Sequence, residues 1–481
     1  MTLTTRRILY STFAAIFFLA APPLVLYTAG FRYDFEYRRV VETGSLVVKS
    51  DPSDATVRLN GELRKEPTPT IINTILPGKI KLLVEKEGYH SWEKEIEIKP
   101  RVTSFEEDIT LFAQSAPEAL AGEAITQYWW NRNQDKFAYA TTGRTLRLFN
   151  ALNQKDELIA NLGPIGSTEL SWSEHEDAFF FTRQNGRGKE EVIIVNTGSP
   201  ERIIPVASLA STAVGQIQWD PKTRASLYAR TQSGAIVRLN YLLATEYRVA
   251  DGPIASFLAE KNRIIMISEP GSGNSLSQLS WINPTDQGTV HLVPGAPRRP
   301  GYRIIPTNSQ YIALARPETR ELIIIDPTVK QGTAIAEPVA ISGVVEYVFA
   351  ENGSAVVYSD GFGMYARSLT TPLSVLPAAY EKSTLVTRYS KPVRSLAVSA
   401  DGRHVFYMVS GELRVNEVAA ASDPRSTTLL SLSAEEAGGA PEISGLRYDE
   451  LGNALTFIGA NGTLQTLALS REDNRAFPFG N

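Results

Sequence analysis

A ten-residue pattern recurs eight times between Trp130 and Phe457, and it constrains the fold more than any other feature of the chain. In each copy a bulky apolar anchor is followed nine positions later by a second bulky apolar residue. The eight pairs are Trp130/Tyr139, Trp172/Phe181, Trp219/Tyr228, Phe257/Met266, Ile305/Leu314, Phe349/Tyr358, Val398/Tyr407 and Tyr448/Phe457. Turn-forming residues such as Asn352-Gly353 and Asp401-Gly402 lie between the two members. Each copy therefore predicts a strand, a tight turn and a second strand.

Successive anchors are separated by 38 residues (Trp219 to Phe257) to 50 residues (Val398 to Tyr448). A third strand is visible in most copies, at residues 146–149, 192–195, 236–239, 322–325 and 413–415, with a less regular one at 281–282. Repetition of several strands at this interval is typical of a β-propeller, in which neighbouring sheets cover each other's apolar faces. The copies predict eight blades, or seven if one copy between Phe257 and Leu314 is irregular.

An uncharged stretch of 22 residues, from Ile8 to Ala29, predicts a transmembrane helix. At roughly 1.5 Å per residue it would be about 33 Å long, enough to cross the apolar core of a bilayer. Two alternatives stay open: a cleaved signal peptide, for example one cut after Gly30, and a buried helix of a soluble domain. We expect residues 8–29 to anchor the chain as a single pass, with the bulk of the chain outside the membrane on the extracytoplasmic side.

The segment after the anchor predicts a compact β domain. Strands are expected at residues 45–50, 56–59, 79–85 and 92–98, and Asn60-Gly61 is a strong hairpin signal. The segment resembles the PEGA domain, a small β-sandwich module of bacterial and archaeal surface proteins. The matching residues are Gly44-Ser45-Leu46-Val47-Val48, Ser50-Asp51-Pro52-Ser53-Asp54-Ala55, Val57, Asn60-Gly61, Thr68-Pro69, Leu76-Pro77-Gly78 and Glu87-Gly88-Tyr89. The tetrad that names the family is Pro52-Ser53-Asp54-Ala55 here, so its two middle residues differ. The resemblance implies an extracytoplasmic adaptor without catalytic residues.

Two of the later repeats carry a second resemblance. Residues 349–358 (FAENGSAVVY) and 398–407 (VSADGRHVFY) are similar to the WD40-like, TolB-type propeller repeat. The predicted order is therefore an anchor (1–30), a juxtamembrane segment (31–43), a PEGA-like β domain (44–112), a linker (113–124) and a β-propeller (125–481). The fold class is mainly β.

The residues that carry chemistry do not assemble into a recognisable motif. The chain has no cysteine, which excludes disulfides and thiolate sites, and its four histidines have no metal-ligand spacing. We interpret these histidines as ordinary surface or turn residues, and residues 271–275 as a flexible loop. The net charge of −4 argues against nucleic acid as a partner. We therefore predict no catalytic, cofactor-binding or metal-binding residue and no cofactor.

Several acidic and amide side chains nevertheless need an interpretation. Asp251, Glu351, Asp360 and Asp401 lie beside glycines in turns, where a structural role is favoured; gathered at the channel mouth, they would suit glycoside hydrolysis. The third strands end in Asn150, Asn196, Asn240, Asn283, Asp326 and Asn416. These side chains are expected to bond their own backbone in turns. The mixed charges of residues 81–99 predict a solvated strand face.

Taken together, these features lead to a function hypothesis based on architecture. The chain is expected to be a membrane-anchored binding or scaffold protein of the cell envelope, whose propeller contacts a protein or a glycan such as a cell-wall polymer. One alternative is a propeller-type extracellular carbohydrate hydrolase or lyase. Another is the sensory domain of an envelope signalling complex.

Overall fold

The chain divides into two compact units in a computed structural model. The structure describes residues 3–28, 30–34, 38–120, 124–133, 135–150, 152–153, 155–163, 169–268, 277–285, 289–293, 295–307, 309–327, 338–369, 383–418, 426–432, 443–450 and 452–471. The first unit comprises Met1–Gln114 with Leu469–Glu472, and the second comprises Ser115–Ala468 with Asp473–Asn481.

The first unit begins with helix α1 (Leu3–Thr28). Its segment Leu9–Thr28 has a mean hydropathy of 1.9 and is, within the described residues, the one helix long and apolar enough to cross a membrane. Large side chains along it, including Phe18 and Leu19, are 74% and 81% exposed. Exposed apolar surface of this extent is unfavourable in water, so the helix is compatible with a membrane anchor or a signal sequence. The hairpin β1 (Phe31–Asp34) and β2 (Arg39–Glu42) follows.

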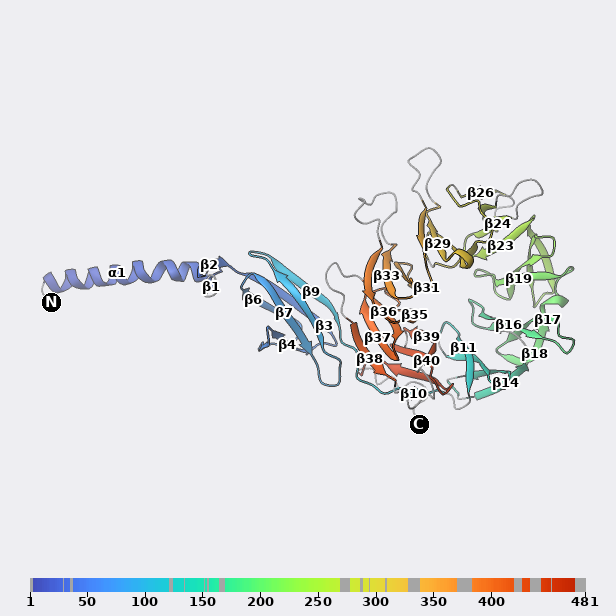
Figure 1. Cartoon of the computed structure of the whole chain (residues 1–481), viewed down its shortest axis with the longest axis horizontal. Helices are drawn as coiled ribbons and strands as arrows, with labels where there is room; N and C mark the ends of the chain where they lie inside the picture. Colours follow the sequence, from blue (N-terminus) through green and yellow to red (C-terminus); the bar gives the residue numbers. More distant parts are fainter. Residues whose placement is uncertain are drawn as a thin grey trace. The chain divides into compact units, whose positions relative to one another are not determined.

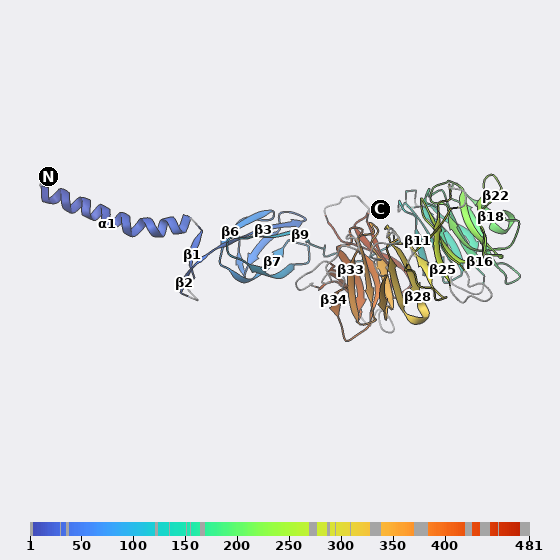
Figure 2. The same cartoon turned by 90° about the horizontal axis from the view of Figure 1, so that it is seen from above.

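A small β-sandwich forms the rest of the first unit. One sheet has the order β6 (Thr70–Ile75), β3 (Gly44–Asp51) and β9 (Thr103–Thr110), and these strands are labelled in Figure 2. The other has the order β5 (Glu62–Leu63), β4 (Thr56–Leu59), β7 (Gly78–Glu85) and β8 (Trp92–Ile98). Alternate apolar residues of both sheets, such as Leu46, Val57 and Leu82, are fully buried in one shared core.

The strands predicted for this unit are present in the structure, but two others, β6 and β9, were not predicted. Asn60 and Gly61 have φ values of 50° and 86°, as the predicted β4–β5 turn requires. The charged strand face is also present, because Lys81 pairs with Glu93 at 2.8 Å across β7 and β8. Strand β9 was not predicted. It has few apolar residues, and it pairs in parallel with β3 about 60 residues earlier, a contact that no local pattern records.

The second unit is a β-propeller, and its described strands form eight four-stranded antiparallel sheets. Seven of these sheets each contain four consecutive strands. They are β11 (Ile125–Trp130), β12 (Lys136–Thr141), β13 (Thr145–Asn150) and β14 (Lys155–Asn161); β15 (Leu170–Trp172), β16 (Ala178–Gln184), β17 (Glu190–Asn196) and β18 (Ser199–Pro205); β19 (Val214–Trp219), β20 (Ser226–Thr231), β21 (Ile236–Asn240) and β22 (Thr245–Ala250); β23 (Ile254–Ala259), β24 (Ile264–Ser268), β25 (Gln278–Ile282) and β26 (Val290–Leu292); β27 (Arg303–Ile305), β28 (Ile312–Arg316), β29 (Glu321–Ile325) and β30 (Val339–Ser342); β31 (Glu346–Phe349), β32 (Ala355–Ser359), β33 (Gly363–Ser368) and β34 (Thr384–Arg388); and β35 (Val393–Val398), β36 (His404–Val409), β37 (Glu412–Glu417) and β38 (Ser426–Ser431). We number these sheets blades 1 to 7 in chain order.

Blade 8 is assembled from both ends of the second unit. Its strands β39 (Ser444–Asp449), β40 (Ala454–Ile458) and β41 (Leu464–Ala468) are consecutive, whereas its outer strand is β10 (Glu118–Ala119). Glu118 pairs with Thr466, and Ala119 pairs with Gln465. The segment expected to be a linker thus contributes a strand, which joins the two ends of the second unit. Two short 3₁₀ turns, Val206–Ser208 and Pro317–Thr319, complete the described elements.

Neighbouring blades share apolar cores around the ring. Phe179 and Phe181 of blade 2, for example, pack with Leu146 and Leu148 of blade 1. A core that contains Tyr139 of blade 1 and Ile458 and Leu464 of blade 8 closes the circle. In Figure 1 the first strands, such as β11, β19 and β35, lie nearest the centre, and the last strands, such as β14 and β38, lie at the rim. Each sheet therefore hides its faces against its neighbours.

The repeat anchors occupy equivalent positions in the blades. Six of them end the first strand of their blade, namely Trp130, Trp172, Trp219, Ile305, Phe349 and Val398, whereas Phe257 and Tyr448 lie one or two residues before the end. Trp130 lies opposite Phe137, and Trp172 lies opposite Phe179. The cross-strand partner in these copies is thus the residue seven positions on. Phe349, Val398 and Tyr448 follow the same register, so in these five copies the second member lies two residues further along, on the same face of the second strand. In the other three copies the register differs: Trp219 and Ile305 face the residue eight positions on, and Phe257 faces Met266 directly.

Candidate functional site

The two faces of the propeller carry different sets of loops. Antiparallel strands bring the start of each first strand and the end of each second strand to one face, which we call the start face. The turns that join first and second strands, such as residues 351–354 and 399–403, form the opposite face, which we call the turn face. A residue's place along its blade therefore decides which potential partners it can meet.

The four candidate carboxylates do not gather at one mouth. Asp251 precedes β23 and Asp360 follows β32, so both lie on the start face, whereas Glu351 and Asp401 lie in turns of the turn face. Asp251 forms an ion pair with Arg248 at 2.6 Å. A gathering of all four residues at one channel mouth is therefore wrong.

Asp360 and Asp401 serve their own turns. Asp360 accepts hydrogen bonds from the amides of Phe362 and Gly363 at 2.9 and 2.6 Å. Burial alone would raise the pKa of Asp360, but these bonds to the ionised form outweigh it and hold the pKa below its usual value. The pKa of Asp401 is lowered in the same way, with burial opposed by hydrogen bonds from Ser399 and from the amide of Arg403. Neither group has the raised pKa that a general acid needs.

The amides that end the third strands are also structural. Asn150 Oδ1 accepts from the amide of Leu152 at 3.0 Å, and Asn196 and Asn240 make equivalent bonds two residues ahead. Asn416 differs, because it is buried and accepts from the Tyr407 hydroxyl at 2.6 Å. The prediction of turn residues is confirmed for Asn150, Asn196 and Asn240, and also for Asn283, whose Oδ1 accepts from the amide of Thr285 at 3.0 Å. Residues 271–275, predicted to be a loop, lie outside the described residues.

His404 is not the surface or turn residue that we predicted, whereas His291 remains partly exposed. His404 starts β36 and is only 7% exposed, and burial lowers its pKa. His291 lies in β26, where its ring stacks on Trp281. Within the described residues no group of three or more His, Asp or Glu is placed to hold a metal ion.

The structure shows a cavity of about 550 Å³ on the start face, between blades 7 and 8. Its lining comes from the start of β35, the β36–β37 turn and the start of β39: Lys391, Pro392, Arg394, Ser395, Met408, Val409, Ser410, Gly411, Ile443 and Ser444. Two cationic side chains, three serines and several apolar groups therefore face one space. These described lining residues include no carboxylate. We call this space the start-face cavity.

Two hydrogen bonds hold the walls of the start-face cavity in place. The amide of Val393 donates to the Gly361 carbonyl at 2.8 Å, which ties β35 to blade 6. The Ser395 hydroxyl donates to the Ile443 carbonyl at 3.3 Å, which ties it to blade 8. Lys391 and Arg394 are exposed on this framework. The cavity can thus accept an anionic group and an apolar flank with little rearrangement of its own.

A carboxylate pair that the sequence did not suggest lies on the turn face. The Asn131 side-chain amide donates both to Asp135 and, at 3.4 Å, to Glu176. Burial raises the pKa of Glu176, and the neighbouring Asp135 carboxylate adds to the effect. The two acids come from blades 1 and 2 and are 41 positions apart, so no local motif connects them.

One comparison with known protein families supports the PEGA-like domain that the sequence predicts in the first unit. The family model described as PEGA domain matches residues 43–111. That segment resembles PEGA domains, as predicted. A search of curated proteins finds no match to the chain.

Three solved structures are similar to this chain at low identity. The β-propeller domain of Cps50 (Swd1) from Myceliophteria thermophila is 14% identical with a TM-score of 0.41, covering 74% of this chain and all of that one. The C-terminal WD40 domain of Sif2 is 13% identical with a TM-score of 0.45, covering 74% and 99%. The designed protein Ika8 is 12% identical with a TM-score of 0.44, covering 74% and 98%. The eight sheets and their shared cores, rather than these distant likenesses, establish the propeller.

Proposed function

We propose that this protein is a membrane-anchored, non-catalytic binding protein of the cell envelope, and that its propeller receives an anionic part of its partner in the start-face cavity. The observation that carries the proposal is the cavity's chemistry. Lys391 and Arg394 face it together with serine hydroxyls and apolar side chains, and no carboxylate is among the described lining residues. Such a site attracts negative charge but has no acid–base pair to catalyse hydrolysis.

The first unit supports the envelope location. Helix α1 is apolar and exposed over Leu9–Thr28, and the PEGA match follows it directly at residues 43–111. A lipid bilayer would cover the apolar side chains that water would otherwise solvate. The β-sandwich then acts as an adaptor between the anchor and the propeller.

Binding can be tested with charge variants on the two faces. Lys391→Gln with Arg394→Gln removes both cations of the cavity, and Arg403→Gln is a matched control because it neutralises an exposed arginine of the turn face. We expect full-length protein to bind a component of envelope fractions, the double variant to lose that binding, and the control to keep it. Equal binding by all three proteins, or binding by none, contradicts the proposed site.

Sidedness needs a separate measurement. Protease treatment of intact cells, followed by mass spectrometry of the released peptides and of the N-terminus, reports both exposure and cleavage. We expect peptides of the propeller to be released and the N-terminal helix to be retained. Protection of the propeller in intact cells would contradict an extracytoplasmic location.

One observation favours the alternative of a carbohydrate hydrolase. Glu176, with its raised pKa, and Asp135 share the Asn131 amide on the turn face, and glycosidases combine one protonated and one ionised carboxyl. If this pair is catalytic, the protein should cleave an envelope polysaccharide and Glu176→Gln should abolish cleavage. Equal product release by Glu176→Gln and the unchanged protein would assign the pair a structural role.

A further inference from the structure

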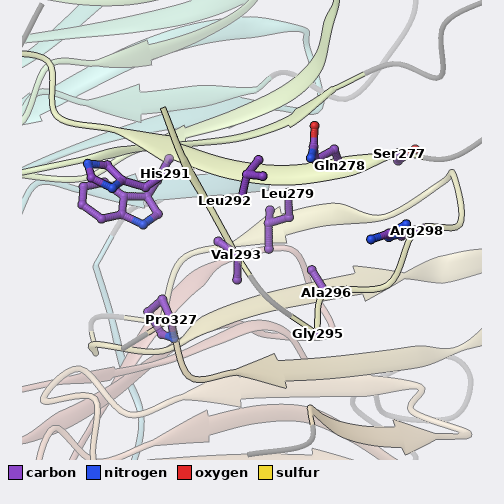
Figure 3. Close-up of a pocket in the computed structure, with 11 residues that line it drawn as sticks. Ser277, Gln278, Leu279, His291, Leu292, Val293, Gly295, Ala296, Arg298 and Pro327 are labelled. Carbon is purple, nitrogen blue, oxygen red and sulfur yellow. The ribbon is translucent and has the colours of Figure 1, made fainter. Parts of the chain in front are cut away.

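A second cavity lies at the rim of the propeller, on residues separate from the start-face cavity. It has a volume of about 360 Å³, within the range of about 300–1,000 Å³ found for ligand pockets. Strands β25 and β26 of blade 4, the loop that follows β26, and Pro327 after β29 of blade 5 form its walls (Figure 3). We call it the rim pocket.

An aromatic pair forms one end of the rim pocket. Trp281 and His291 are direct cross-strand partners, and their rings stack with centroids 4.0 Å apart and planes 16° apart. Trp281 is partly buried against the core shared by blades 4 and 5, which fixes the pair in place. His291 is only partly buried, so the pair presents a flat, rigid surface to a ligand. In Figure 3 His291 lies at one end of the pocket, and Arg298 lies at the other.

The opposite wall is a loop that is tied to β25 at two points. The amide of Val293 donates to the Leu279 carbonyl at 3.0 Å, and the amide of Ser277 donates to the Arg298 carbonyl at 2.9 Å. These bonds hold the described part of the loop alongside β25. The pocket is therefore organised before any ligand arrives, which reduces the entropy lost on binding.

Charge and polarity divide the rim pocket into distinct regions. Arg298 is exposed and forms no ion pair with a described residue, and none of the lining residues is acidic. Ser277 adds a hydroxyl at the Arg298 end of the pocket, whereas the side chain of Gln278 leaves β25 on the face opposite to Leu279. One ligand should therefore carry a flat apolar face, hydrogen-bonding groups and a negative charge.

We propose that the rim pocket binds a short acidic glycan, a run of carboxylated pyranose rings. The C–H face of one ring would pack on the His291–Trp281 pair through dispersion and burial of apolar surface. The carboxylate of a neighbouring ring would meet Arg298, beside the Ser277 hydroxyl, because a planar guanidinium matches a carboxylate with two parallel hydrogen bonds. The inference is independent of the start-face cavity and stands or falls on its own experiment.

The test is calorimetric titration of the full-length protein in detergent with a short oligogalacturonate, and with neutral oligogalactose of the same length. We expect the acidic probe to bind more tightly, and binding to weaken as salt rises. Arg298→Gln should weaken the acidic probe by about tenfold or more and change the neutral probe little. Arg299→Gln is the matched control, because Arg299 is an adjacent exposed arginine outside the lining.

The aromatic contact is tested by a second pair of variants. His291→Ala should weaken both probes, whereas His291→Phe, which keeps a flat ring, should retain binding. The proposal is overturned if acidic and neutral probes bind alike, if Arg298→Gln behaves as Arg299→Gln does, or if neither probe binds at millimolar concentration. It is also overturned if polyglutamate binds as tightly as oligogalacturonate and its affinity is unchanged by His291→Ala. That result would indicate a cationic patch without a site for a sugar ring.

Discussion

The indole nitrogen of Trp219 donates to the carbonyl oxygen of Ser171 at 2.9 Å, so the anchor of blade 3 is hydrogen-bonded to the first strand of blade 2. Trp172 repeats the contact one blade earlier, with the carbonyl of Trp129 at 3.0 Å. In both cases the acceptor immediately precedes the anchor of the preceding blade. The anchors therefore combine apolar packing with a directional bond that sets the position of one blade on the next.

Replacement of Trp219 by phenylalanine should destabilise the propeller, because it leaves the Ser171 carbonyl without its donor. Trp130→Phe is the matched control: Trp130 is as buried as Trp219, at 8% against 7% exposed, but its indole nitrogen has no hydrogen-bond partner among the described residues. The loss in Trp219→Phe should exceed that in the control by about 1–3 kcal/mol. Urea unfolding measures the difference, and equal losses would show that the bond contributes nothing.

Two glutamines join blades 3 and 4 in a way that can be followed by hydrogen exchange. Gln218 Oε1 accepts from the Ala259 amide at 2.7 Å, and Gln216 Oε1 accepts from the Phe257 amide at 3.1 Å. Gln218→Leu leaves the Ala259 amide unpaired, so its exchange should accelerate and stability should fall by about 1–3 kcal/mol. Gln232→Leu, in an exposed turn, should change neither quantity. Unchanged exchange at Ala259 in Gln218→Leu would rule out the proposed bridge.

The stability of the propeller should fall at alkaline pH. Burial, with the Asp220 carboxylate adding to it, raises the pKa of Tyr228 from its ordinary value of 10.0 to about 12. Between these two values the unfolded chain loses the proton and the folded chain keeps it, so unfolding becomes easier by up to about 1.4 kcal/mol per pH unit. Tyr228→Phe should show a shallower decline over this window in urea unfolding. Identical slopes would mean that Tyr228 titrates normally.

Gly88 makes room for Arg471 within the first unit. Gly88 has a φ of 79°, and a Cβ there would overlap the Arg471 guanidinium, which donates to the Gln114 carbonyl at 3.1 Å. Gly88→Ala should therefore displace Arg471 and accelerate tryptic cleavage after it. Gly61→Ala is the control, because Gly61 has a similar φ of 86° with open space around it. Both variants should lose about 1–2 kcal/mol from backbone strain; only Gly88→Ala should change cleavage at Arg471, and equal cleavage would refute the contact.

The strands that could be predicted from the sequence are those with a local pattern of apolar residues. The second strands and most third strands are rich in buried apolar residues, because neighbouring blades cover both of their faces, and these strands lie where they were expected. The outer strands did not stand out, because their residues are largely exposed: β22, for example, keeps Tyr247 64% exposed and has no buried residue. Strand β10 has only two residues, and its pairing of Glu118 with Thr466 links positions 348 apart. No periodicity can report such a contact.

The candidate sites show the same division. The sequence by itself determined the apolar helix at residues 8–29, the β-sandwich and the repeating sheets, because the spacing of apolar side chains dictates which faces must leave water. Only the tertiary structure decided which side chains meet. Asp360 and Asp401 lie on opposite faces. Lys391 and Ser444 line the start-face cavity, and Trp281 and Arg298 line the rim pocket. Ring closure brings together distant segments, and the loops at each face then place side chains that share no local pattern.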